Sequence, residues 1–262
     1  MSKIQLYGFN NLTKSLSFSL YKLHYLVDKH ACEHYPTHIQ QHYSATQLST
    51  LLIDICHAIG GNVLNIASQD YQPQGASVTI MISEEAQPEP LPTNQPISNN
   101  KITPESVVAH LDKSHLCVHT YPEESPQNDI AIFRADIELS TCGVISPLKV
   151  LNFVISSFEA DVIDIDYRVR GMTRNSQGKQ LFIDEKIENI SDSLSAKVKA
   201  NYKVANHNLT SHNLFHSKLA KTEMALEDYL FEYQVENLTT QQQIDIKDKI
   251  DRVMTQLFNA LQ

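Results

Sequence analysis

The chain has 262 residues, of which 42% are hydrophobic and 19% charged, so its composition is that of an ordinary globular protein and not of a disordered one. Its 30 acidic and 21 basic residues give a net charge of −9 without a long basic run, which argues against nucleic acid or an anionic membrane as the main partner. No run approaches about 18 consecutive apolar residues, and the N-terminus lacks the apolar core of a secretory signal. We therefore expect a cytoplasmic protein whose four cysteines are thiols.

The first predicted elements are a helix and two strands. Residues 44–59 predict an amphipathic helix that ends at two glycines, and its apolar side chains follow the helical spacing: Leu48, Leu51, Leu52, Ile55 and Ile59. Strands are predicted over 62–68 and 77–83, joined by a loop with a proline and a glycine. The segment 86–104 holds five of the ten prolines and few large apolar residues, so we expect a surface linker.

Strands dominate the segment after the linker. Short apolar, β-branched runs predict strands over 106–111 and 115–120. Residues 130–139 alternate between apolar side chains on one face and Arg134, Asp136 and Glu138 on the other, which is typical of a half-buried strand.

The remaining elements repeat the order of helix, strand, strand. Ser146 followed by a proline predicts the start of a helix, whose apolar stripe is Leu148, Leu151, Ile155 and Phe158. Strands are expected over 162–169 and 179–184, and residues 185–262 are expected to be mostly helical. This order predicts an α+β fold, a layered α/β sandwich of antiparallel sheets covered by helices. We divide it into a unit 1–184 and a C-terminal extension 185–262.

Four histidines form a ladder near the N-terminus. His30, His34, His38 and His42 are spaced four apart, and such residues share a helix face suited to metal. Pro36 lies between them and is expected to break that helix. We therefore favour a polar surface segment over a metal site.

Two segments carry residue types that suit catalysis. In LDKSHLCVHTYPE, residues 111–123, a strand places His115, Cys117 and His119 on one face and Ser114 on the other. The alternatives are a strand edge with a satisfied histidine or nucleophilic catalysis. In STCGVISP, residues 140–147, Cys142 lies between a strand and a predicted helix start. It is either a small buried hydrophobe or a reactive thiol.

These two segments belong to a longer pattern. LDKSHLCVHTYPE, FRADIELSTCGVISPLKVLN, DIDYRVRGMTR, GFNNLTKSLSF and NIASQDYQPQGASVTI together closely resemble the S-adenosylmethionine decarboxylase proenzymes of the longer bacterial class. The resemblance runs from about residue 4 to residue 184. It implies that family's fold, with the catalytic residues in the unit 1–184 and two chains, 1–113 and 114–262, after self-cleavage.

The resemblance assigns the self-cleavage to the bond between Lys113 and Ser114. The Ser114 hydroxyl would attack the Lys113 carbonyl and form an ester. Elimination would then leave a dehydroalanine that hydrolyses to ammonia and a covalent pyruvoyl group, which holds the substrate as a Schiff base. His119 matches the family's base for processing, and a short turn of the strand would bring it to hydrogen-bonding distance. Cys142 matches the proton donor in decarboxylation.

The resemblance also implies substrate contacts and partners. Glu123 matches a carboxylate that binds ribose hydroxyls, and Phe9 an aromatic that stacks on adenine. Magnesium is expected, but no ligand is identified. The implied reaction converts S-adenosyl-L-methionine to S-adenosyl 3-(methylsulfanyl)propylamine for spermidine biosynthesis, in an oligomer of processed two-chain protomers. The alternatives are a pyruvoyl-dependent arginine or ornithine decarboxylase, or a non-catalytic regulatory paralogue.

Overall fold

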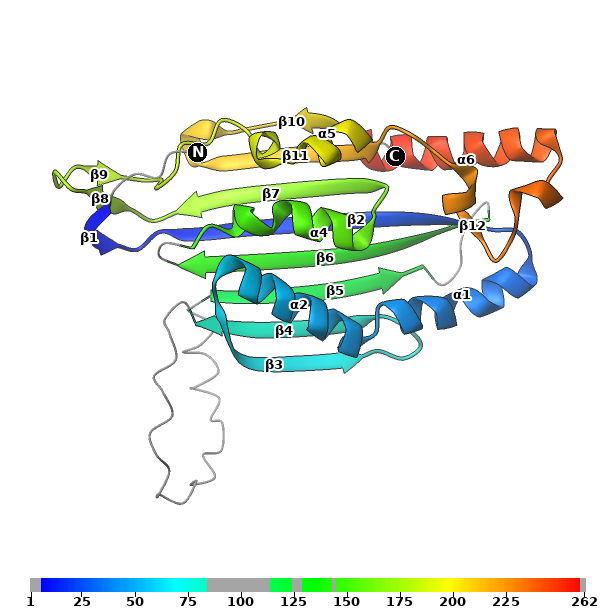
Figure 1. Ribbon diagram of the computed structural model, residues 1–262, viewed down its shortest axis with the longest axis horizontal. Coiled ribbons are helices and arrows are strands. Elements are labelled where there is room, and N and C mark those ends of the chain that lie inside the picture. The colour runs from blue at the N-terminus through cyan, green and yellow to red at the C-terminus, as the bar shows by residue number, and fades with distance from the viewer. Residues whose placement is uncertain (1–5, 84–113, 124–128, 143–144, 260–262) are drawn as a thin grey trace, which may run out of the picture.

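A long antiparallel sheet organises the molecule (Figure 1). The computed structural model describes residues 6–83, 114–123, 129–142 and 145–259, and the side chains of 6–10 are outside that description. The linker 86–104, the predicted strand 106–111 and Lys113 therefore lie outside the described residues.

The main sheet has nine strands. Eight follow the order β10-β11-β7-β2-β6-β5-β4-β3 with antiparallel pairing, and β12 pairs parallel with β2 at its end. Their bounds are β2 Thr13–Leu26, β3 Asn62–Asp70, β4 Ala76–Ser83, β5 Ser114–Pro122, β6 Ile130–Cys142, β7 Val162–Arg170, β10 Tyr202–Asn206, β11 Leu214–Lys221 and β12 Leu230–Phe231. A small sheet joins β1 Leu6–Asn10, β8 Thr173–Asn175 and β9 Gln180–Leu181.

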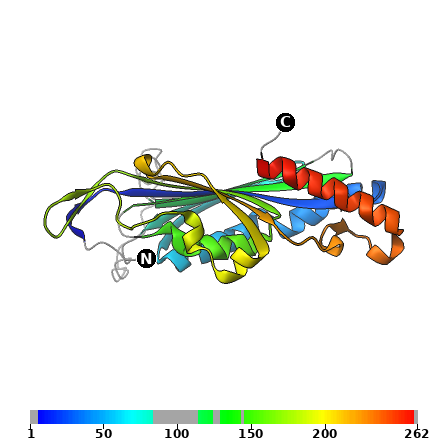
Figure 2. The same cartoon turned by 90° about the horizontal axis from the view of Figure 1, so that it is seen from above.

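Helices lie on both faces of the sheet. Their bounds are α1 Lys29–His42, α2 Ala45–Ile59, α4 Leu151–Phe158, α5 Ala196–Asn201 and α6 Thr240–Asn259, with 3-10 turns at Pro147–Val150, Ile190–Ser193, Thr210–His212, Leu226–Asp228 and Val235–Asn237. One apolar core joins the sheet to α1, α2 and α4, and a second joins it to α6. Figure 2 shows α6 on the opposite side of the sheet from α2 and α4. No helix in the described part of the chain is both long and apolar enough to cross a membrane.

The strongest periodic patterns are confirmed. The α2 helix begins where Ser44 accepts a hydrogen bond from the Gln47 amide, and it ends at Gly60, whose positive φ of 86° suits glycine. In β6 the apolar alternation faces the core, as expected, while Arg134 and Asp136 are only half-buried. The predicted strands at 62–68, 77–83, 115–120 and 162–169 correspond to β3, β4, β5 and β7.

Two expectations about individual helices need correction. Pro36 does not break the histidine segment, because α1 runs through it without interruption. The Asp28 carboxylate caps that helix, and Ala31, Tyr35 and Ile39 bury its inner face, which compensates for the missing amide donor. Ser146 does not cap the helix after it; the chain forms a 3-10 turn before α4.

The C-terminal region is less helical than expected. Strands β10 and β11 lie within 185–262 and extend the main sheet, since residues 214–220 of β11 pair with β7. The boundary at residue 184 therefore does not separate two structural units. The predicted strand 179–184 shrinks to Gln180–Leu181 in the small sheet.

Candidate active site

Ser114 and Cys142 meet at one end of the strand pair β5–β6. Ser114 is the first residue of β5 and is buried, with 2% of its surface exposed. The Cys142 amide at the end of β6 donates a hydrogen bond of 3.1 Å to the Ser114 hydroxyl oxygen. The antiparallel register, in which His115 faces Ser140, brings the two residues together. The sequence predicts that each of the two residues lies on a strand or at its end, but it does not predict that they are neighbours.

A buried polar row extends from Ser114 across the sheet. Thr141 lies beside Ser114 in the register of β5 and β6, and Lys14 of β2 pairs with Thr141. All three side chains are buried on the core side. The Lys14 ammonium lies 2.7 Å from a carboxylate oxygen of Asp184, and the exposed fractions of these side chains are 1% and 13%. A buried charge is tolerated only when it is paired, so Lys14 and Asp184 form one unit, two strands away from Ser114.

Lys14 is not among the residues predicted for the site, although its place in the sequence carries a signal. Lys14 occupies the first inward position of an alternation that continues with Leu16, Phe18 and Leu20. A lysine in phase with buried apolar residues indicates a buried charge. Its partner Asp184 lies far along the chain, and no local pattern points to it.

His119 lies on the opposite face of β5 from Ser114. The strand is unbroken over Ser114–Pro122 and alternates between buried and half-buried side chains. Five residues of strand span about 16 Å, and an odd separation places two side chains on opposite faces. The expectation that a turn brings His119 to hydrogen-bonding distance of Ser114 in the same chain is therefore wrong for this state. Instead, the strand is fixed on both sides, with His119 facing Ser77 of β4 and Asp136 of β6.

Cys117 shares the His119 face, as the sequence predicted. Burial and the neighbouring Glu138 carboxylate raise the pKa of the Cys117 thiol. A raised pKa keeps the thiol protonated at neutral pH, which argues against Cys117 as a nucleophile.

Glu123 lies at the other end of β5 from Ser114. Its carboxylate accepts a hydrogen bond of 2.9 Å from the Ile132 amide, and its own amide donates to the Ile132 carbonyl at 3.1 Å. These bonds close the β5–β6 ladder at that end. Phe9 lies in β1, but its side chain is outside the described residues. The structure therefore does not bring Glu123 to the Ser114 of its own chain.

Among the described residues, no cluster of carboxylates identifies a magnesium site. Magnesium prefers oxygen ligands, usually carboxylates and phosphates with water. In the described ranges, the one cluster of at least three candidate ligands is His30, His34 and Glu232, and two of its members are imidazoles.

A surface hollow of about 450 Å³ lies away from Ser114, between α4 and the segment that contains α5, and Glu159, Lys197 and Glu223 contribute to its lining.

Comparisons with known proteins identify the family of this chain. The family model described as S-adenosylmethionine decarboxylase matches residues 23–171. The chain belongs to the S-adenosylmethionine decarboxylase family. S-adenosylmethionine decarboxylase proenzymes similar to it include that of Stenotrophomonas maltophilia (strain K279a), 44% identical over 99% of this chain and 97% of the relative. Another is that of Pseudoalteromonas translucida (strain TAC 125), 47% identical over 98% of this chain and 94% of the relative.

Solved structures from the S-adenosylmethionine decarboxylase family are more distant. The adenosylmethionine decarboxylase of Aquifex aeolicus VF5 aligns with 69% of this chain and 100% of its own, at 13% identity and a TM-score of 0.35. The monomer of the Trypanosoma brucei AdoMetDC-delta26 aligns with 80% of this chain and 66% of its own, at 13% identity and a TM-score of 0.36.

Proposed function

We propose that this chain is a proenzyme that cleaves itself before Ser114 and then decarboxylates S-adenosylmethionine, supplying aminopropyl groups for spermidine. The observation that carries the proposal is the buried Ser114 hydroxyl, held by the Cys142 amide at the start of β5. The relatives that match nearly the whole chain are named as proenzymes, which supports internal processing. A cytoplasmic location is part of the proposal, since the four cysteines are thiols and not disulfides.

The processing step uses the two functional groups of one serine. The Ser114 oxygen attacks the Lys113 carbonyl carbon, the peptide C–N bond breaks, and an ester and a free amine result. Removal of the Ser114 α-proton expels the Lys113 carboxylate, and hydrolysis of the resulting dehydroalanine releases ammonia and leaves a carbonyl. The Cys142 amide positions the attacking oxygen. When formed, the pyruvoyl group supplies the electron sink for decarboxylation.

Residues from the matched motifs have further proposed roles. Cys142 donates the proton that the substrate carbon takes up after carbon dioxide leaves, and Phe9 stacks on adenine. His119 is the base for the α-proton, and Glu123 binds the ribose hydroxyls. We assign these last two roles to residues of a second copy of the chain. His119 lies on the opposite face of β5 from the Ser114 of its own chain, and Glu123 lies at the other end of that strand. An oligomer that presents them to a neighbour's Ser114 explains both displacements.

The decisive measurement is the intact mass under denaturing conditions. We expect a first chain of 113 residues and a second of 262 − 113 = 149 residues. The second should be about 17 Da lighter than a chain with an N-terminal serine, because ammonia is lost. The Ser114→Ala variant should remain one chain. An active wild-type enzyme that is a single intact chain would refute the proposal. Carbon dioxide release from S-adenosylmethionine, arginine and ornithine, measured separately, identifies the substrate.

Co-expression of two inactive variants tests the role of a second copy. Ser114→Ala and His119→Ala should each stay uncleaved alone. If His119 acts on a neighbouring chain, co-expression should cleave the His119→Ala chain, which retains Ser114. Absence of cleavage in a mixed oligomer confirmed by light scattering would show that His119 acts within its own chain or not at all.

A further inference from the structure

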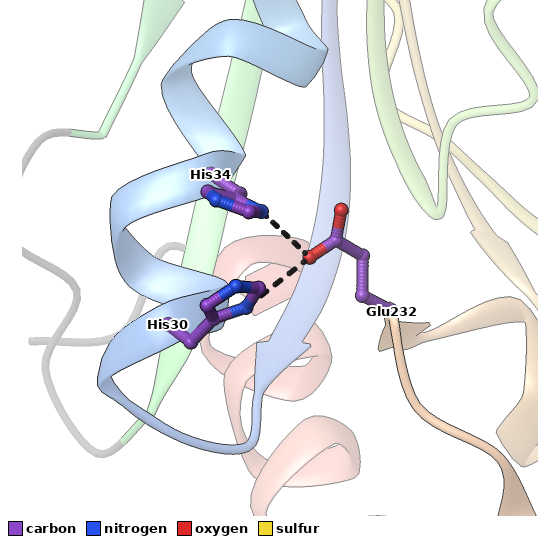
Figure 3. Close-up of side chains that lie close together, drawn as sticks. All are labelled: His30, His34 and Glu232. Atoms are coloured by element: carbon purple, nitrogen blue, oxygen red, sulfur yellow. Dashed lines mark ion pairs between the residues drawn. The ribbon is translucent and has the colours of Figure 1, made fainter.

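The histidine ladder and a distant glutamate form a cluster separate from Ser114. His30 and His34 lie one turn apart on α1, and their ring centroids are 3.9 Å apart. Glu232 follows β12, and its Oε2 lies 3.3 Å from His34 Nδ1 and 3.9 Å from His30 Nδ1. Figure 3 shows the three side chains pointing toward one another.

The surrounding structure fixes the position of Glu232 relative to α1. Strand β12 pairs with the end of β2, and Phe231 faces Leu26 in that ladder. The Phe231 ring is buried and packs edge-on against Tyr35 of α1, with ring centroids 5.4 Å apart. Glu232 is the next residue and has a φ of 55°, in the left-handed region. The carboxylate is therefore attached to an anchored segment and not to the tip of an independent loop.

Two imidazoles and a carboxylate are a ligand set that zinc prefers. Zinc binds such atoms at about 2.0–2.2 Å in a tetrahedron, which separates neighbouring ligand atoms by about 3.3 Å. In the cluster, one candidate ligand atom from each residue lies within 4.8 Å of the other two. All three side chains are substantially exposed, so small rotations are enough to close the remaining gap.

We propose that His30, His34 and Glu232 bind one divalent ion of the zinc class, with water in the fourth position. The ion joins α1 to the segment after β12 and so adds a crosslink between the first helix and the C-terminal part of the fold. The same contacts without metal would be an imidazolium–carboxylate ion pair, so metal binding must be measured directly.

The chain supplies a matched control on the same helix. His38 and His42 have the same spacing, and their ring centroids are 4.2 Å apart. His42 Nδ1 lies 2.9 Å from the His38 carbonyl oxygen. Among the residues that the structure describes, no third ligand completes a cluster with this pair.

The test is calorimetric titration of the mature enzyme with Zn²⁺, with Mg²⁺ as the comparison ion and the visible spectrum of bound Co²⁺ as a second readout. Wild type should bind one Zn²⁺ per copy, show tetrahedral Co²⁺ absorption and unfold at a higher temperature when loaded. Loss of one residue that hydrogen-bonds to a metal ligand typically lowers metal affinity by about 10- to 100-fold. The H30Q/H34Q variant lacks two direct ligands, so its affinity for Zn²⁺ should be lower by more than about 100-fold.

Two further variants complete the test. Glu232→Gln should weaken Zn²⁺ binding by at least about tenfold, and it remains informative if the double histidine variant does not fold. H38Q/H42Q should bind Zn²⁺ as wild type does. Absence of binding to wild type, wild-type affinity in H30Q/H34Q or Glu232→Gln, or an equal loss in H38Q/H42Q would each overturn the proposal. Decarboxylase activity is not a readout, so this result is independent of the proposed function.

Discussion

His24 on β2 should make the folded chain sensitive to acid. Its Nδ1 lies 3.1 Å from the Tyr35 hydroxyl, and its ring packs near His38. Burial lowers the pKa of His24 from 6.5 to about 3, and the positive charges of Lys22 and of protonated His38 act in the same direction. The neutral ring is the form that the fold accommodates.

The sign and size of the effect follow from proton linkage. Between about pH 3 and 6.5 the unfolded chain binds a proton at His24 that the folded chain does not bind, so stability falls as the pH decreases through this window. Above 6.5 the contribution of His24 is fully present. At pH 5 the loss is RT ln(1 + 10^1.5), or about 2 kcal/mol relative to pH 8.

The assay is urea unfolding of the uncleaved Ser114→Ala chain at pH 8 and pH 5, with and without His24→Gln. Other titrating groups are common to both proteins and cancel in the comparison. The decrease in unfolding free energy from pH 8 to pH 5 should be about 2 kcal/mol smaller in His24→Gln. His57→Gln, at an exposed position of α2, is the matched control and should keep the original decrease. An unchanged pH dependence in His24→Gln would refute the reasoning.

Three further predictions concern the site and its surroundings. Lys14→Met leaves the Asp184 carboxylate without its partner and should lower the free energy of unfolding, measured by urea titration, by about 3 kcal/mol. The double variant with Asp184→Asn should regain part of the lost stability. Gly171→Ala places a side chain against a backbone carbonyl at a φ of 89° and should destabilise by more than about 1 kcal/mol, whereas Gly178→Ala, at a positive φ in open space, should cost less. In Cys142→Ala, intact mass should show normal cleavage, but the variant should release little carbon dioxide from substrate. If this variant is not cleaved, Cys142 acts in processing as well as in proton donation, which contradicts the prediction.

Regular periodicity determined which elements could be predicted. The helical spacing of leucines in α2 and the alternation in β6 identify those elements because each pattern repeats without a mismatch. Strand β11 has the same alternation, but Ser217 occupies an inward position between Phe215 and Leu219. Because serine is polar, it interrupts the apolar alternation, and the strand is not recognised from the sequence. Its pairing with β7 is a long-range contact that no local pattern contains.

Proline in α1 shows how tertiary packing overrides a local rule. A proline inside a helix removes one amide donor and disfavours helix continuation. In α1, Tyr35 next to the proline is buried, and Ile39 one turn later is buried too. Packing of these side chains against the sheet supplies the stability that the missing hydrogen bond does not, and only the folded arrangement reveals it.

The candidate site shows where sequence reasoning reached its limit. The motifs identify Ser114, His119 and Cys142 by residue type, and period-two alternation alone places Ser114 and His119 on opposite faces. Whether a turn relieves that separation depends on the neighbouring strands. Because β5 is paired with both β4 and β6 between these two residues, a turn there would break hydrogen bonds on two sides. The ladder therefore separates the two residues within one chain, and the same ladder brings Cys142 to Ser114. Under the proposed function, the role of His119 as a base therefore needs a second copy of the chain, and the co-expression experiment tests this.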